Sequence, residues 1–385
     1  MPLKVAARGA IPPFIVMEVV RAAAARAAAG GDVLHLEIGQ PSTPAPRAVI
    51  AAAQAALGRD VLGYTEALGI APLRQRLAAF YRERYGVAVP AERIALTVGS
   101  SGAFLLAFLA AFDAGDRVAL TLPGYPAYRH ILRALDIVPV EIPVGPETGF
   151  HPTVEQLARI VESQGGLAGL IVASPANPTG TMLSRNHLDA LAAFCAARSI
   201  RLISDEIYHG ISYGMPATTA LAVSDDAVVI NSFSKYFSMT GWRLGWMVLP
   251  EDLVRAVECL AQNLFISPPS LAQHAALAAF DSIPELEDNV RRYAANRALL
   301  LAALPEAGLR DFAPADGAFY LYADVGHLTN DSEAFCRRLL ADTGVALTPG
   351  IDFDPARGSR TVRISFAGAT ADMEEAARRL KAWRS

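Results

Sequence analysis

The chain has 385 residues, of which 52% are hydrophobic and 19% are charged. A chain of this length and composition is expected to form two or three domains around a large buried core. The formal net charge is −4, and the sequence has no basic run of the kind that marks a nucleic-acid-binding protein. Three widely spaced cysteines and no paired histidines argue against a disulfide framework and a catalytic metal.

The N-terminal stretch lacks the continuous apolar segment of a signal peptide, and the alanine-rich segment 22–29 is too short to span a membrane. The cysteines lie among apolar residues, and buried free thiols fit a reducing compartment. We therefore expect a cytoplasmic protein with no membrane partner and no nucleic-acid partner.

Residues 1–45 are punctuated by prolines, and we expect them to be irregular. Short apolar runs begin near residue 94, and near-continuous runs of this kind suit strands that are buried on both faces. The runs span 94–98, 117–121, 168–172, 201–204, 228–231 and 244–248. Helical patterns lie between them, so the sequence predicts an α/β fold with a mostly parallel central sheet.

Three of these helical patterns allow more detailed expectations. Segment 103–112 is apolar all round and should be wholly buried. Segment 153–164 opens with a capping box formed by Thr153 and Gln156, and segment 184–198 opens with Ser184.

The last third of the chain differs from the middle. Long helical patterns follow residue 270, with strand-like stretches at 318–323 and 361–366 and a final helix from Thr370. This change predicts a large domain over residues 46–279 and a smaller α+β domain built from residues 1–45 and 280–385.

Two segments rich in glycine or proline follow predicted strands, where open parallel sheets bind their ligands. TVGSSGA (97–103) leads into a buried helix, so its backbone N–H groups and two hydroxyls would form a phosphate cradle. The alternative is a tight turn that requires glycine. ASPANPTG (173–180) is a rigid loop that either forms an ordinary turn or aims Asn177 at a ligand oxygen.

Two further segments place charged groups in apolar surroundings. Asp205 ends an apolar strand, where a carboxylate either caps a helix or is paired with a buried cation. Lys235 follows the run 228–231, and Arg243 comes shortly after it among aromatic neighbours. Either cation alone could be a surface charge. An amine near apolar groups and other cations, however, has a lowered pKa and becomes nucleophilic.

Together these parts are what pyridoxal phosphate requires. The lysine would form an imine with the aldehyde, and the carboxylate would keep the pyridine nitrogen protonated so that the ring accepts electrons. Asn177 and Tyr208 would hydrogen-bond the phenolic oxygen of the ring. The phosphate would be bound by Ser100, Ser101, Ser232 and Arg243.

The segments ANPTG, SDEIY, NSFSKYFSMTGWRLG and VRISF resemble those of class I/II aminotransferases, the aspartate aminotransferase superfamily. The similarity extends from IGQPSTPAP (38–46) to VRISF (362–366), and the order and spacing of the motifs are far more specific than any one of them. The resemblance implies the PLP-dependent transferase fold of type I, an α/β fold with a large and a smaller domain. It also implies pyridoxal 5′-phosphate as the cofactor.

The resemblance further implies a role for each matching residue. Lys235 matches the Schiff-base lysine, which also moves a proton to and from the substrate Cα. Asp205 matches the partner of the pyridine nitrogen, and Tyr208 matches a ligand of the ring oxygen, as does Asn177. Lys235, Asp205 and Tyr208 are therefore the expected catalytic residues.

Other matches concern the phosphate and the substrate. Arg363 matches the arginine that binds the substrate α-carboxylate, with Gly39 and Asn177 beside it, and a bidentate guanidinium suits that role. Tyr125 matches the aromatic residue that stacks on the ring. Tyr64 matches a residue that reaches the phosphate of the other subunit, which implies a homodimer with shared sites. The phosphate site is matched by Gly99, Ser100, Ser101, Ser232 and Arg243.

The amino donor is less well defined by the sequence. Ser101 stands where some aspartate-specific members carry a lysine, which weakens the case for a dicarboxylic substrate. An apolar set of residues hints at aromatic or aliphatic substrates, although such residues more often pack in a core. The set is Ile11, Phe14, Ile15, Ile38 and Phe319.

The implied activity is the ping-pong transfer of an amino group between an L-amino acid and a 2-oxo acid. Other reactions on the same cofactor, such as those of a C–S β-lyase or a synthase, remain open because one fold hosts many chemistries. A non-catalytic effector module is disfavoured by the acidic charge and by the early start of the fold. A dinucleotide-binding enzyme would need a G-x-G-x-x-G turn, which GSSG does not supply.

Overall fold

Seven strands form the central sheet of the structure, a computed structural model that describes residues 3–383. Their order is β2-β8-β7-β6-β5-β3-β4, and the pairs are parallel except those that β8 makes with β2 and β7. The strands are β2 (Ile94–Thr97), β3 (Arg117–Leu122), β4 (Val138–Pro143), β5 (Gly169–Ala173), β6 (Arg201–Asp205), β7 (Val228–Ser232) and β8 (Gly245–Val248).

The six predicted runs are confirmed as six of these strands, and β4 is the strand that the sequence did not indicate. β4 contains Pro139 and Pro143, which obscure a strand pattern. It lies at the edge of the sheet, where proline is tolerated because only one side of the strand needs hydrogen bonds. The mostly parallel sheet is confirmed, with β8 as its antiparallel member.

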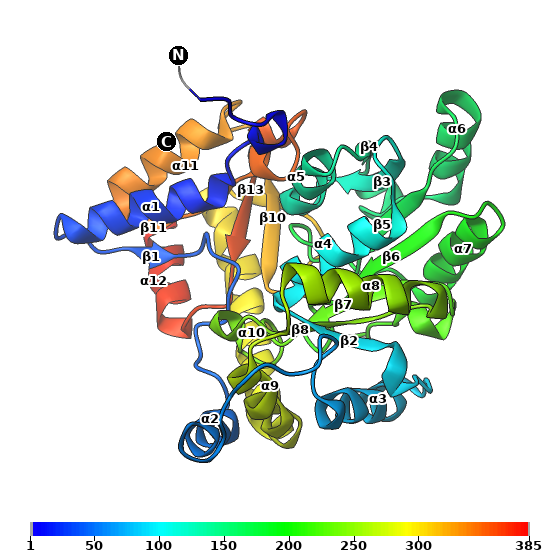
Figure 1. Ribbon diagram of the computed structural model, residues 1–385. Helices are drawn as coiled ribbons and strands as arrows, with labels where there is room; N and C mark the ends of the chain where they lie inside the picture. The colour runs from blue at the N-terminus through cyan, green and yellow to red at the C-terminus, as the bar shows by residue number, and fades with distance from the viewer. Residues whose placement is uncertain (1–2, 384–385) are drawn as a thin grey trace.

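Helices cover both faces of this sheet (Figure 1). On β7, Val228 and Ile230 pack in the cluster that contains α4 (Gly99–Ala111), α5 (Pro126–Ala134) and α8 (Glu251–Leu264). Val229 packs in the cluster on the other face, with α3 (Ala71–Tyr85), α6 (Val154–Gln164) and α7 (Arg185–Ala196). Burial on both faces explains why the strands read as continuous apolar runs.

The helix expectations are confirmed in part. The capping box of α6 is present, since Gln156 N–H donates to Thr153 Oγ1 at 3.2 Å and Thr153 N–H donates to Gln156 Oε1 at 3.0 Å. The side chain of Ser184 caps α7. The expectation that 103–112 is wholly buried is wrong, because Leu109 is 37% exposed.

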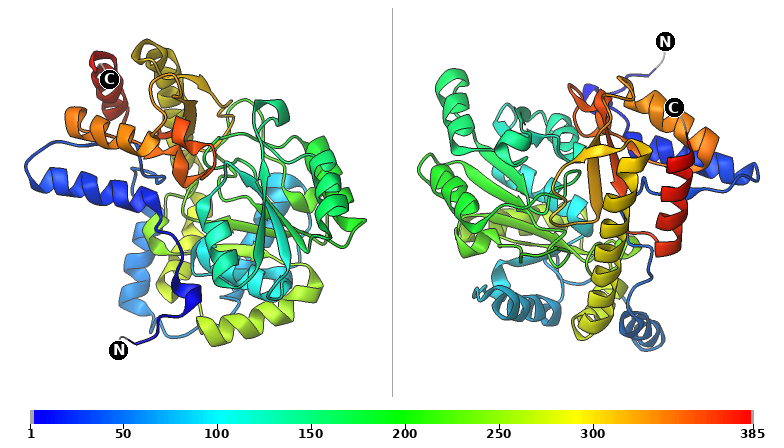
Figure 2. Two further views of the ribbon diagram at one scale, coloured as in Figure 1. Left: turned by 90° about the horizontal axis from the view of Figure 1, so that it is seen from above. Right: turned by 180° about the vertical axis from the view of Figure 1, so that it is seen from behind.

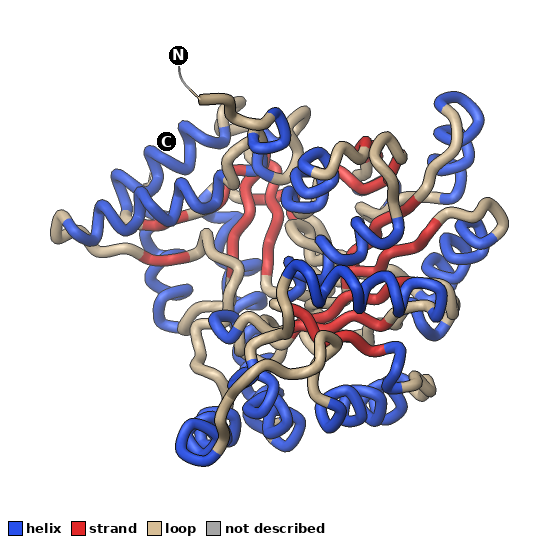
Figure 3. The backbone as a smooth tube through the Cα atoms, in the orientation of Figure 1, coloured by secondary structure: helices blue, strands red, loops and turns tan. Residues whose placement is uncertain are grey.

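A second, smaller arrangement of strands lies beside the central sheet (Figure 3). One sheet is antiparallel, in the order β12-β13-β10-β9, and β1 pairs with β11 in parallel. The strands of these two sheets are β1 (Leu34–His35), β9 (Arg310–Phe312), β10 (Tyr320–Asp324), β11 (Val345–Ala346), β12 (Thr348–Pro349) and β13 (Thr361–Ser365). The remaining helices are α2 (Arg47–Arg59), α9 (Ser270–Ala276), α10 (Ile283–Ala303), α11 (Ser332–Thr343) and α12 (Thr370–Ala382). The predicted late strands and final helix are confirmed.

The expectation that residues 1–45 are irregular is wrong, because α1 (Ile15–Ala28) is a helix that contacts α11 and β12 (Figure 2). Its alanine-rich sequence has a high intrinsic helix propensity. The carboxylate of Asp352 accepts hydrogen bonds from the N–H groups of Ile15 and Val16, each at 3.2 Å, and so caps the first turn. Of the prolines that suggested irregular structure, Pro12 and Pro13 lie just before the helix, and Pro41 and Pro44 lie well after it.

The division into residues 46–279 and the two flanking segments stays a prediction, and its ends, 1–2 and 384–385, lie outside the described residues. Within residues 3–383, no helix has the length and apolar character needed to cross a bilayer. Cys195, Cys259 and Cys336 are free thiols, but Cys259 is partly exposed, so the expectation of buried cysteines holds for two of them.

Candidate active site

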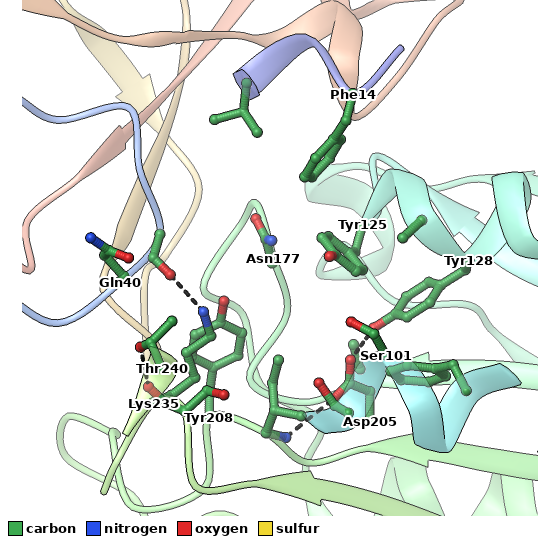
Figure 4. A pocket seen from close by; sticks show the side chains of 18 of the residues that line it. Phe14, Gln40, Ser101, Tyr125, Tyr128, Asn177, Asp205, Tyr208, Lys235 and Thr240 are labelled. Atoms are coloured by element: carbon green, nitrogen blue, oxygen red, sulfur yellow. Dashed lines mark hydrogen bonds between the residues drawn. The ribbon is translucent and has the colours of Figure 1, made fainter. Parts of the chain in front are cut away.

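A cavity of about 290 Å³ lies between the carboxyl ends of the central strands and the smaller sheet (Figure 4). Asp205 is the last residue of β6, and Lys235 follows β7, so both side chains reach the same edge of the sheet. Arg363 enters from β13, and Phe14 enters from the segment before α1. The cavity is therefore lined by residues at the ends of the central strands on one side, and by the smaller sheet and the N-terminal segment on the other.

Lys235 is the amine in the cavity. Its Nζ donates a hydrogen bond to the carbonyl oxygen of Gly39 at 2.6 Å. The pKa of Lys235 is lowered to about 8 by burial and by the positive charges of Arg363 and Arg243, against the opposing effect of Asp205. Gly39 tolerates no side chain, since the hydroxyl of Tyr320 occupies the place of a Cβ atom. The amine is thus held at a fixed place and loses its proton readily.

Asp205 lies across the cavity from Lys235 (Figure 4). One carboxylate oxygen accepts the N–H of Ile207 at 3.1 Å, and the other accepts the hydroxyl of Tyr128. The pKa of Asp205 is raised to about 6, because burial outweighs the opposing effects of these hydrogen bonds and of Lys235. The carboxyl group is therefore ionised above about pH 6 and fixed in orientation, as a partner of a protonated nitrogen must be.

Arg363 and Asn177 form one unit beside Lys235. The Nη1 of Arg363 donates to Asn177 Oδ1 at 2.9 Å, and its Nη2 donates to the carbonyl of Glu37 at 2.5 Å and to Thr348 Oγ1 at 3.2 Å. Arg363 is only 3% exposed, and its Nε has no hydrogen-bond partner among the described residues. A buried cation with an unpaired donor is suited to bind an anionic group.

Aromatic side chains form the walls near Asn177. The hydroxyl groups of Tyr208 and Tyr320 are hydrogen-bonded at 2.7 Å, and burial raises the pKa of Tyr208. The ring of Tyr125 lies edge-on to that of Phe14, with centroids 5.8 Å apart. Burial also raises the pKa of Tyr125 to about 12, so its phenol stays protonated. Tyr208 and Tyr125 therefore present neutral hydroxyl donors to the cavity.

The amino terminus of α4 forms another wall. Ser100 and Ser101 line the cavity in the first turn of the helix, and Arg243 lines it close to the start of the same turn. Gly99 has φ +67°, and a Cβ atom there would meet the guanidinium of Arg243. A helix N-terminus, two hydroxyls and an arginine form a site for a phosphate.

Three predicted residues, Gly99, Ser232 and Tyr64, do not line the cavity; Gly99 is buried at the start of α4. Ser232 is buried behind Ser234, to whose hydroxyl it donates at 2.9 Å, and Ser234 lines the cavity in its place. Tyr64 is 83% exposed on the loop after α2 and contributes nothing to the cavity of its own chain.

The predicted apolar residues divide into three groups. Phe14 and Ile38 line the cavity, together with Val16 and Met17. Ile11 lines a neighbouring cavity. Ile15 and Phe319 line neither, and Phe319 is fully buried in the main core. The hint of an apolar substrate pocket therefore holds for two of the five residues, Phe14 and Ile38.

Sequence reasoning missed several lining residues, which are Tyr128, Ser234, Thr240 and Tyr320. Tyr128 lies three residues after Tyr125, on the same face of α5, and this spacing was a usable signal. Tyr320 was hidden beside Phe319, because only the pleat of β10 decides which of the two side chains faces the cavity.

Comparisons with known proteins were made on the whole chain. Residues 31–380 match the family described as aminotransferase class I and II. Valine–pyruvate aminotransferase of Mycobacterium tuberculosis is 55% identical over 384 residues, covering 99% of this chain and 98% of that protein. Aspartate/prephenate aminotransferase of Thermus thermophilus is 33% identical over 355 residues, covering 91% and 90%.

Solved structures give the same result. An aminotransferase from Mycobacterium tuberculosis superposes with a TM-score of 0.96 at 54% identity and covers 99% of both chains. A double mutant of Thermus thermophilus aspartate aminotransferase superposes with a TM-score of 0.92 at 31% identity, covering 99% of this chain and 100% of the other. The similarity extends over both the central sheet and the smaller one.

Proposed function

Because the chain belongs to the class I and II aminotransferase family and is an aminotransferase, we propose that its cavity binds pyridoxal phosphate and transfers the amino group of an aliphatic L-amino acid to a 2-oxo acid. One observation carries the cofactor proposal. An amine with a pKa of about 8, on Lys235, faces a buried carboxylate, that of Asp205, across a cavity with an anion site at its edge.

The residues of the cavity fit the cofactor group by group. Lys235 would hold the aldehyde as an imine, and Asp205 would pair with the pyridine nitrogen. Asn177 and Tyr208 would donate to the ring oxygen, and the ring would lie against Tyr125. The phosphate would be held by the first turn of α4 and by Ser100, Ser101, Ser234 and Arg243, with Ser232 supporting Ser234 from behind.

The bound cofactor supplies a ring that accepts electrons from the substrate Cα. Lys235 Nζ then acts as the base that removes the Cα proton and later returns a proton, since its lowered pKa leaves it able to do both near neutral pH. Arg363 holds the α-carboxylate and so fixes which Cα bond faces Lys235. The N-terminal segment covers the cavity and limits the entry of water.

The donor is proposed to be aliphatic, with valine as the first candidate and pyruvate as the first acceptor. The name of the Mycobacterium tuberculosis relative, which is 55% identical, supports this choice. Phe14, Val16, Met17 and Ile38 form the apolar side of the cavity, which suits an uncharged side chain. Ser101 offers no positive charge for a second carboxylate.

A homodimer with shared sites is also proposed. Tyr64 is exposed on its own chain, and the nearby Val61 is 99% exposed, which is unusual for large side chains that have no partner. In a dimer, Tyr64 would complete the phosphate site of the partner subunit.

A half-reaction without acceptor tests the proposed function. Holoenzyme mixed with valine should release one equivalent of the matching 2-oxo acid per site and convert the bound cofactor to its amino form, and pyruvate should then restore the original spectrum. Continuous release of a thiol, pyruvate and ammonia from an S-substituted cysteine, without any acceptor, would instead indicate a C–S β-lyase.

Removing Arg363 is expected to act on substrate binding. Arg363→Ala should raise the KM for valine by about 10- to 100-fold, the cost of a lost charged hydrogen bond, and should change kcat less. Arg363→Lys keeps the charge but loses the bidentate geometry, so its KM for valine should lie between those of the wild type and Arg363→Ala. Steady-state kinetics measure this, and an unchanged KM would show that another residue binds the carboxylate.

Capture of the cofactor should follow the protonation of Lys235. Because only the neutral amine attacks an aldehyde, the rate at which apoprotein binds pyridoxal phosphate should rise about ten-fold between pH 6 and pH 7 and level off above a pKa of about 8. Stopped-flow absorbance measures this rate. A rate that keeps climbing up to pH 10 would mean that the amine has an ordinary pKa.

A further inference from the structure

The neighbouring cavity that Ile11 lines has a volume of about 410 Å³ and lies beside the active-site cavity. Its outer walls are Ile11 and Pro12 of the N-terminal segment, Leu105 of α4, and Ala134 and Leu135 at the end of α5. These walls are apolar. We call this space the side chamber.

The side chamber and the active-site cavity share one wall. The same four residues line both, which are Phe14, Tyr125, Ala127 and Ile131. The Phe14 ring points from the N-terminal segment toward Tyr125 and meets it edge-on, at an interplanar angle of 84° (Figure 4). Tyr125 also faces the proposed cofactor site, and Ala127 is small. Phe14 is therefore the largest side chain of this wall apart from Tyr125.

The backbone next to Phe14 is held in place. The buried carboxylate of Asp352 accepts the N–H groups of Ile15 and Val16 at 3.2 Å each, and the carbonyl of Asp352 accepts Arg129 Nη2 at 2.6 Å. Arg129 lies on α5, the helix that forms the opposite side of the shared wall. Phe14 is therefore anchored to the wall that it closes.

The side chamber carries no charge at neutral pH. Apart from the phenol of Tyr125, its one ionisable side chain is His130, and burial with the charges of Arg129 and Arg133 lowers the pKa of His130 to about 4. An uncharged, apolar chamber suits an aromatic or long aliphatic side chain. It does not suit a second carboxylate.

We propose that Phe14 is a specificity-determining residue that closes the active-site cavity against the side chamber, so that short aliphatic side chains are accepted and aromatic ones are excluded. The inference rests on the proposed function and deepens it. A substrate side chain longer than that of valine would have to enter the side chamber, and the Phe14 ring stands in its path. Truncating Phe14 would join the two spaces.

Binding of unreactive substrate analogues tests this role without turnover. The probes are 3-methylbutanoate and 3-phenylpropanoate, which are valine and phenylalanine without the amino group. Calorimetry with the holoenzyme measures the affinity ratio, which is the affinity for the aromatic analogue divided by that for the aliphatic one. Phe14→Ala should raise this ratio by about ten-fold or more, the effect of opening space in an apolar pocket. The ratio of kcat/KM for phenylalanine and valine should move in the same direction.

Two further variants keep the inference falsifiable. Ile11→Ala removes an apolar side chain from the outer wall only, and it should leave the affinity ratio unchanged. In the Phe14→Ala background, Ala134→Phe should refill the side chamber and reverse the gain. If Phe14→Ala does not fold, the milder Phe14→Leu should give a smaller shift of the same sign.

An unchanged affinity ratio in a folded Phe14 variant would overturn the role of Phe14. This outcome is separate from failure of the proposed function. If the wild-type holoenzyme converts no aliphatic amino acid, the proposed donor is wrong, yet the affinity ratio still decides whether Phe14 closes the side chamber.

Discussion

Lys235→Ala should lower kcat for the valine half-reaction by about 10⁴-fold or more, the upper range for loss of an acid–base group. The variant loses both the amine that binds the aldehyde and the base that faces the substrate Cα. Pyridoxal phosphate should still bind, because the phosphate site and Asp205 are unchanged. Single-turnover kinetics and equilibrium dialysis measure the two effects separately.

The chain offers matched controls for Lys235. Lys235→Arg keeps a positive charge but cannot form the imine, so it should lose as much activity as the alanine variant. Lys381→Ala removes an exposed lysine that pairs with Glu306 on the surface, and it should behave as wild type. Appreciable activity in either Lys235 variant would remove this residue from the mechanism.

The second large effect is expected at Asp205. Asp205→Ala should lower kcat by about 10³-fold, a typical cost of removing a preorganised charge that stabilises the reacting group. The fall should be accompanied by weaker cofactor binding, since the partner of the pyridine nitrogen is lost. Near-wild-type kcat with normal cofactor affinity would contradict this role.

Tyr128→Phe provides a graded comparison for Asp205. The variant keeps the carboxylate and the packing of the ring against Phe104, whose centroid is 4.9 Å away, but it removes the hydroxyl that donates to Asp205. We expect a loss of about ten-fold in kcat, near the value of one charged hydrogen bond, with little change in KM. A loss as large as that of Asp205→Ala would mean that the fold, and not the charge, is disturbed.

The sequence predicted the central sheet well, because strands buried on both faces show as continuous apolar runs. It predicted β4 and α1 poorly. Pro139 and Pro143 break the pattern of an edge strand. The N-terminal helix α1 depends on a cap from Asp352, which lies more than 300 residues away in the sequence. Long-range contacts of this kind leave no local signal.

In the candidate site, too, features with a local sequence signal were predicted and features that depend on long-range contacts were not. The motifs indicated Lys235, Asp205, Asn177 and Arg363, which the structure brings to one cavity. The first three lie at a strand end or in a loop that follows a strand, whereas Arg363 lies within β13. The hydrogen bond from Tyr128 to Asp205 and the contact of the Phe14 ring with Tyr125 could not be predicted, since both depend on how α5 packs against the N-terminal segment and the sheet. The chemistry of the site is thus local in sequence, whereas the shape that selects a substrate is not.

One measurement tests the central claim most directly. Borohydride converts an imine to a stable amine, so treating the purified holoenzyme with it and mapping the peptides locates the lysine that holds the cofactor. We expect a phosphopyridoxyl group on the peptide that contains Lys235 and none on those with Lys4 or Lys381, the other lysines of the chain. A label on either of those residues, or no label at all, would contradict the claim.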